Sequence, residues 1–188
     1  MKKIVALALA LPCGLACGLY GISAYAQQKP AAPPQKTQAP QKATVIGTYA
    51  DWQALTYKQG NVETCYVASF PKKSEGRQVK LGDANILVTH WPSQKTYGVI
   101  SVTGGFDYKK DSSVELVVGD EKFTLFTQGP RGWAQDGDDA KIVKALKAGK
   151  ETIAAGMTAS GTRTKDSYSL EGFTKAYEEA SKACGVKG

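Results

Sequence analysis

The sequence has few of the residues and motifs that enzymes use. It contains one histidine, His90, and no Gly-x-Ser-x-Gly, Gly-x-Gly-x-x-Gly or Gly-Lys-Ser/Thr pattern. These absences argue against a nucleophile elbow, a dinucleotide fingerprint and a P-loop, and one histidine leaves no plausible zinc-ligand set. We expect no catalytic residue, no metal and no cofactor, with His90 packed or solvated. The alternative is a periplasmic enzyme with a cleft that gathers His90 and a carboxylate such as Asp83 or Asp107.

The sequence also lacks an apolar run of the roughly 20 residues that a membrane-spanning helix needs. Its first part has Lys2 and Lys3, an apolar stretch over 4–11 and a small-x-small site at Ala24–Ala26. This is the pattern of a secretory signal peptide over residues 1–26. A membrane anchor is the less favoured alternative, because Pro12 interrupts the apolar stretch. We expect an exported protein that is periplasmic, associated with the outer membrane or secreted.

Cysteine is scarce as well, and cleavage after Ala26 would leave only Cys65 and Cys184. An even number of cysteines in an oxidising compartment predicts one disulfide. Two buried thiols or one catalytic thiol are the alternatives. A lipoprotein acylated at Cys17 is a further alternative, although the residues before Cys17 form a poor lipobox.

Charge is abundant and uneven, with 24 Lys and Arg against 17 Asp and Glu. Lys72, Lys73, Arg77 and Lys80 lie close together and are offset only by Glu75. In an exported protein such a cluster favours an anionic partner, either an envelope polyanion or a host-surface macromolecule, and it allows peripheral membrane association. The alternative is a solvated loop. Nucleic acid is disfavoured, because the chain has an export signal and no motif that reads bases.

Composition divides the chain after the expected signal peptide. Residues 27–44 hold four prolines and no large apolar residue, which predicts a disordered tether. From residue 45 to residue 188, short segments of alternating hydrophobicity are separated by Gly, Asp and Ser turns, which predicts one antiparallel β domain shaped as a sandwich or small barrel. The expected strands cover 51–58, 62–70, 85–91, 96–104, a hairpin over 113–128 with a Gly119-Asp120 turn, 150–161 and 162–170.

Two helices interrupt the strands. The first has Asp138 or Asp139 as its N-cap and ends at Gly149. Capping explains the run "DGDD" better than calcium, because the spacing lacks the features of an EF-hand loop. The second helix is expected to begin after Ser169 as N-cap and to run to Cys184. The residues expected on the buried faces are Ile142, Val143, Leu146, Leu170, Phe173, Tyr177 and Ala180.

Several segments together resemble a known family. They are "YADWQALTY", "CYVASFPKKSEG", "ILVTHWPSQK", "KFTLFTQGPRGWA" and "GTRTKDSYSLEGFTKAYEEASKACG". In this order they resemble the invasion-associated locus B family, small exported proteins of alphaproteobacteria. Many relatives carry a further cysteine in the region of Leu55-Thr56-Tyr57, so the second bridge of such relatives is absent here.

The resemblance implies an all-β fold, an immunoglobulin-like antiparallel β-sandwich with a C-terminal helix, to which the residue pattern adds one short inserted helix. It also implies a non-catalytic interaction factor linked to host-cell association or envelope function. Similar proteins occur in bacteria that are not pathogens, so invasion cannot be the general biochemical activity.

Overall fold

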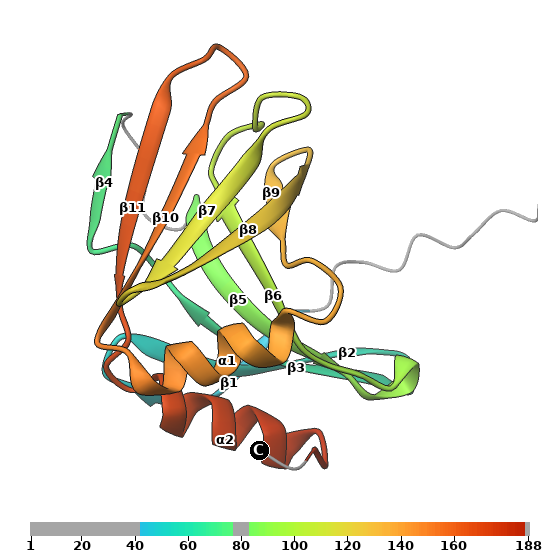
Figure 1. Cartoon of the computed structure of the whole chain (residues 1–188). Coiled ribbons are helices and arrows are strands. Elements are labelled where there is room, and N and C mark those ends of the chain that lie inside the picture. The colour runs from blue at the N-terminus through green and yellow to red at the C-terminus, as the bar shows by residue number, and fades with distance from the viewer. Residues whose placement is uncertain (1–41, 77–82, 187–188) are drawn as a thin grey trace, which may run out of the picture. The chain divides into compact units, whose positions relative to one another are not determined.

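The computed structural model describes residues 42–76 and 83–186, which form one antiparallel sheet and two α-helices (Figure 1). The predicted signal peptide and most of the predicted tether lie outside these residues. The elements are β1 (Thr44–Tyr49), β2 (Trp52–Gln59), β3 (Val62–Ser69), β4 (Lys73–Glu75), β5 (Ala84–Trp91), η1 (Pro92–Gln94), β6 (Thr96–Gly104), β7 (Ser113–Val118), β8 (Glu121–Gln128), β9 (Arg131–Trp133), α1 (Asp139–Ala148), β10 (Glu151–Met157), β11 (Arg163–Ser169) and α2 (Phe173–Ala183).

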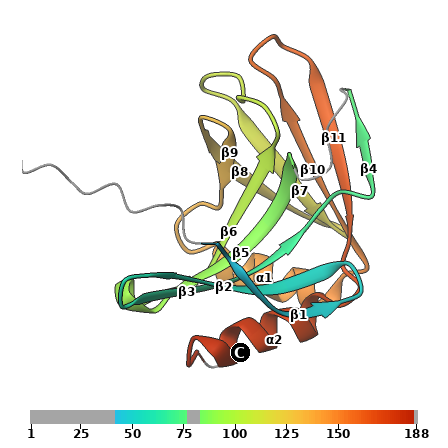
Figure 2. The same cartoon turned by 180° about the vertical axis from the view of Figure 1, so that it is seen from behind.

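The sheet curls back on itself. Its strand order is β1-β2-β3-β5-β6-β9-β8-β7-β10-β11-β4, so β3 and β4 follow each other in the chain but β4 lies at the far edge. Only residues 70–72 separate these two strands, a span of at most about 14 Å. The far edge must therefore return to the neighbourhood of β3. The predicted all-β class with two helices is confirmed, and its two layers are continuous in one strongly bent sheet (Figure 2).

Hydrogen bonds join the two ends of the curled sheet. The indole Nε1 of Trp52 on β2 donates to the carbonyl oxygen of Ser169 on β11 at 2.9 Å. The amide of Asp51 donates to the carbonyl oxygen of Glu171 at 3.2 Å, and the Ser69 hydroxyl donates to the carbonyl oxygen of Asp51 at 2.8 Å. The first two bonds connect residues more than 100 positions apart, and with the third they hold the layers together at one end.

Most predicted strands are present with nearly the expected bounds. The β7–β8 hairpin turns at Gly119-Asp120, as its pattern predicts, because Gly119 adopts the positive φ that such a turn needs. Three strands were not predicted. β4 and β9 have three residues each, too few for a visible alternation, and β1 lies where the proline-rich composition ends.

The helices confirm their predicted faces and correct two predicted caps. Asp138 occupies the N-cap position of α1 but makes no side-chain capping bond, and it contacts Lys141 Nζ at 2.6 Å instead. The predicted N-cap Ser169 is wrong, since it ends β11, and Gly172 is the residue that precedes α2. Gly172 has a φ of 91°, and a Cβ there would collide with the carbonyl oxygen of Tyr49. Because this turn packs closely on β1, the helix begins only at Phe173.

Both helices pack at one end of the curled sheet. α2 contacts β1, β2, β3 and β5, and α1 contacts β6 and α2. The buried ring of Phe173 meets Trp52 edge-on, with 4.8 Å between ring centroids. In the described part of the chain, neither helix is long and apolar enough to cross a membrane.

Candidate functional site

The two cysteines of the described residues lie at disulfide distance, as the sequence predicts. The Cα atoms of Cys65 and Cys184 are 5.9 Å apart, within the usual range of a bridge. Cys65 is fully buried near the middle of β3, and Cys184 directly follows α2. The pair therefore ties the end of the last helix to a central strand.

His90 is a structural residue of the same region. It lies opposite Cys65 in the β3–β5 pairing and is fully buried. Its Nδ1 accepts a hydrogen bond from the amide of Gly98 at 3.2 Å, and its Nε2 lies 3.2 Å from the hydroxyl of Ser181 on α2. Burial lowers the pKa of His90, because a charged imidazole would lose its hydration there.

The carboxylates that an enzyme at His90 would need lie elsewhere. Asp83 directly precedes β5, whereas His90 is near the other end of that strand, roughly 23 Å away at the usual rise per residue. Asp107 follows β6 at the end where Gly104 pairs with Ala84, which is again the end remote from His90. Both acids are exposed. The structure therefore does not bring Asp83 or Asp107 to His90.

The predicted basic segment is only partly free. Lys72 forms an ion pair with Asp51, and this contact is the main reason why the pKa of Asp51 is lowered. Lys73 Nζ lies 2.7 Å from a carboxylate oxygen of Glu75, on the same edge strand β4. Arg77 and Lys80 lie outside the described residues. Lys72 thus serves to attach the segment to β2.

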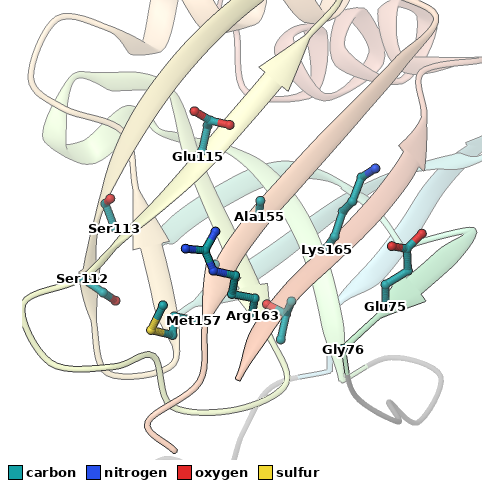
Figure 3. Close-up of a pocket in the computed structure, with 11 residues that line it drawn as sticks. Glu75, Gly76, Ser112, Ser113, Glu115, Ala155, Met157, Arg163 and Lys165 are labelled. Carbon is teal, nitrogen blue, oxygen red and sulfur yellow. The ribbon is translucent and has the colours of Figure 1, made fainter. Parts of the chain in front are cut away.

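A shallow hollow of about 720 Å³ opens beside this segment, on the face of β4, β11, β10 and β7 that points away from the core (Figure 3). We call it the outer hollow. Ala155 lies between the strands that line it, and Arg163 and Lys165 project over it from β11. The lining residues are Glu75, Gly76, Ser112, Ser113, Glu115, Ala155, Gly156, Met157, Arg163, Thr164 and Lys165.

The charges around the outer hollow are unbalanced. Glu75 is paired with Lys73, and Glu115 lies 3.8 Å from Lys122. Within the described ranges, no carboxylate oxygen lies within ion-pair distance of Arg163. The lining itself holds Arg163 and Lys165 with Glu75 and Glu115, a net charge of 2 − 2 = 0. Lys73 and Lys122, which pair with these acids from outside the lining, bring the net charge of the group to 4 − 2 = +2. The outer hollow is therefore an open surface that is cationic together with Lys73 and Lys122.

Comparison with known proteins identifies the family. A family model described as invasion associated locus B (IalB) protein matches residues 52–181. The chain belongs to the invasion-associated locus B family. The description of the invasion-associated locus B family names no enzymatic activity. No curated protein and no solved structure matches the chain.

The match covers most of this invasion-associated locus B protein and stops short of two features. It begins at Trp52, which bonds the two ends of the sheet, so the edge strand β1 lies outside it. It ends at Ser181, which contacts His90, three residues before Cys184. The matched region therefore contains the core and only one of the paired cysteines.

Sequence reasoning missed Arg163 and Lys165 as candidate site residues. Both occur in a segment that was expected only to be a strand. A signal was present, because the two cations alternate with the buried Thr164 and must share the outward face. What the sequence did not reveal is that β4 pairs with β11, which brings the basic segment beside these cations.

Proposed function

We propose that this protein is a non-catalytic, exported protein of the cell envelope or cell surface that binds an anionic macromolecule. The family supports an invasion-associated role, and the family together with the cysteine pair favours export. The buried position of His90 supports a non-catalytic role, because its ring nitrogens are engaged by Gly98 and Ser181.

The observation that carries the proposal is the pairing of β4 with β11. The sequence suggested Lys72, Lys73, Arg77 and Lys80 as the basic segment. The pairing adds two cations of the outer hollow to this segment, Arg163 and Lys165. Lys72 is retained by the half-buried Asp51, whereas the ion pair of Lys73 with Glu75 is exposed and can open to a partner. We therefore assign binding to the cations other than Lys72. The partner would be an envelope polyanion or a host-surface macromolecule.

Such binding should depend on several weak contacts. An exposed ion pair contributes on the order of 0–1 kcal/mol, so no single cation can hold the partner. Screening shortens the reach of each charge from about 10 Å at 0.1 M salt to about 3 Å at 1 M. Association with the partner should therefore weaken steeply as salt rises.

A triple charge reversal tests the proposal. Lys73→Glu, Arg163→Glu and Lys165→Glu together should release the protein from outer-membrane fractions at about 0.1 M salt. The melting temperature should fall only slightly, through repulsion of Glu75 on the exposed edge strand. The matched control reverses three exposed lysines of the helices, Lys144, Lys175 and Lys182, and should stay bound. Equal retention of both variants would refute binding at this surface.

Export has its own test. N-terminal sequencing of the protein from the envelope fraction should give Gln27 as the first residue, as the Ala24–Ala26 site predicts. Retention of Met1 on the bulk of the protein would contradict the expected cleavage and leave the binding test unaffected.

A further inference from the structure

The outward face of β1, β2, β3, β5 and β6 carries rows of side chains without charge. Directly opposed residues of neighbouring strands share a face, so the register shows which side chains lie side by side. Two rows of opposed residues cross all five strands, and a shorter pair on β2 and β3 extends them. We call these residues the neutral face: Thr48, Gln53, Ala68, Leu87 and Ser101 in the first row, Val45, Leu55, Tyr66, Thr89 and Val99 in the second, and Tyr57 and Thr64 in the pair.

The neutral face points away from both helices. Successive side chains of a strand point to opposite faces of the sheet. Cys65 and His90, which contact the end of α2, and Ile100, which joins the core together with the buried side of α1, all lie on the other face. Leu55 and Ala68 of the neutral face do not belong to the core cluster. Neither helix therefore covers this surface.

The lack of charge is a property of this face and not of the chain. Lys, Arg, Asp and Glu make up 22% of the residues, and the outward side of the other layer carries Glu115, Arg163 and Lys165. On the neutral face the larger side chains are apolar or aromatic, and Val45 is 49% exposed. A surface that is depleted of charge and holds aromatic residues has the composition of the centre of a protein–protein interface.

We propose that the neutral face binds the neutral face of a second copy of this chain in a two-fold dimer. Such dimers are the commonest assemblies of soluble proteins, and they place the same patch of both copies against each other. A patch without charges can do so without opposing like charges. Tyr66 belongs to the middle strand of the five and to the middle row, so it would lie near the two-fold axis. Face-to-face packing of two sheets is the arrangement found in β-sandwiches.

The size of the neutral face fits a reversible dimer. Five strands about 4.8 Å apart, with outward positions over about seven residues of about 3.3 Å each, give a surface of roughly 24 Å by 23 Å, or about 550 Å². Two copies would bury about 1,100 Å² together, which exceeds the roughly 1,000 Å² expected of a specific interface and belongs to the class of weak complexes. We therefore expect a dissociation constant in the micromolar range.

The chemistry of the neutral face fits other occupants less well. A polyanion finds no cation among these residues, and a charged protein surface would lose its hydration there without gaining a counter-charge. Lipid hydrocarbon would leave the amide of Gln53 and the hydroxyl of Thr64 unpaired, whereas a second copy offers amides and hydroxyls as partners. The inference goes beyond the proposed function, because a dimer would present two outer hollows to one partner and strengthen weak contacts through multivalency.

Sedimentation velocity of the exported protein, purified from the envelope fraction, tests the inference. Over a series from about 1 µM to about 500 µM we expect a shift from one copy to two, as an interface of this size implies. Tyr66→Lys and Tyr66→Glu should each stay monomeric, because like charges would face each other near the axis. An equimolar mixture of these two variants should dimerise, because a lysine then faces a glutamate. Leu87→Lys repeats the disruption at a neighbouring position should a Tyr66 variant not fold.

Two control variants show whether the effects belong to this face. Thr124→Lys adds a lysine at an exposed position of β8 outside the neutral face, and Arg163→Glu alters the outer hollow. Both should dimerise like the unaltered protein. The dimer can therefore fail while binding at the outer hollow holds, and the reverse.

Several results would overturn the inference. They are an unaltered protein that stays monomeric at the highest concentration, a folded Tyr66→Lys variant that dimerises normally, and a mixture of the two folded Tyr66 variants that does not dimerise. Dimerisation only after deletion of residues 27–41 would assign the face to the chain's own N-terminal segment. Binding of the monomer to phosphatidylcholine vesicles, lost in Tyr66→Lys, would assign it to lipid. Both of these results would also overturn the dimer.

Discussion

The two layers of the curled sheet are held together in different ways. The layer of β2, β3 and β5 is covered by α2 and buries Trp52, Phe173 and the fully enclosed Cys65. The layer of β10, β11 and β4 has no helix over its outer face. Both layers bury some polar side chains, Ser69, Thr89 and His90 in the first and Thr152, Thr164 and Asp166 in the second. There the Thr152 hydroxyl donates to the carbonyl oxygen of Val117 at 2.9 Å, and the Ser74 hydroxyl donates to a carboxylate oxygen of Asp166 at 2.6 Å.

This difference bears on where binding surfaces can lie. The helix-covered end uses apolar burial and a cross-link to hold α2, and it leaves His90 no access to solvent. The outer faces of the sheet carry no covering element, so their side chains remain available to a partner. Stability and binding therefore belong to different faces of the same sheet, and variants can separate them.

The largest expected effect on stability comes from removing a buried aromatic ring at the helix-covered end. Phe173→Ala removes a fully buried ring that packs on Trp52, so we expect a loss of about 3–5 kcal/mol in the free energy of unfolding by urea. Phe126→Ala is the matched control on an outer face and should cost less than about 1 kcal/mol. Equal losses would mean that the two regions do not differ as described.

Breaking the cysteine pair should have the next largest effect. Cys184→Ser should lower the free energy of unfolding by about 2–5 kcal/mol, because a cross-link over such a long loop restricts the unfolded chain. Hydrogen exchange should show the loss first in α2. Alkylation in denaturant without a reductant checks the bridge itself, since it should label neither Cys65 nor Cys184 in the exported protein.

A smaller effect is expected where α1 joins the sheet. The Asp139 Oδ1 accepts a hydrogen bond from the amide of Ile100 at 2.9 Å, and burial raises the pKa of this carboxyl group. Asp139→Ala leaves that amide unpaired and should cost about 1–3 kcal/mol. Asp139→Asn keeps an acceptor without a buried charge and should melt close to the unaltered protein. Equal melting temperatures for the two variants would contradict this role.

The smallest effect concerns pH. Burial lowers the pKa of His90 in the folded state and keeps its imidazole neutral. In the unfolded chain the same imidazole has the ordinary histidine pKa of about 6.5, so it binds a proton once the pH falls below that value. Stability should be full above that pH and should decline as the pH falls from about 7 to 5, by at most about 1.4 kcal/mol per pH unit. His90→Gln should flatten this part of the pH profile, and an unchanged slope would assign it to other groups.

Local patterns in the sequence determined much of the secondary structure. The β7–β8 hairpin follows from alternating residues around Gly119-Asp120, and the helix faces follow from apolar residues at helical spacing. Cys65 and Cys184 were the only pair left for a bridge once export was inferred. Each of these features depends on residues close together in the chain or on a simple count.

Only the tertiary structure decided which distant segments meet. It paired β4 with β11, which places the basic segment beside Arg163 and Lys165. Strand register depends on how whole faces pack and how loops close, and neither is encoded in a local window of residues. The fold class could therefore be read from the sequence, whereas the outer hollow is a product of long-range pairing.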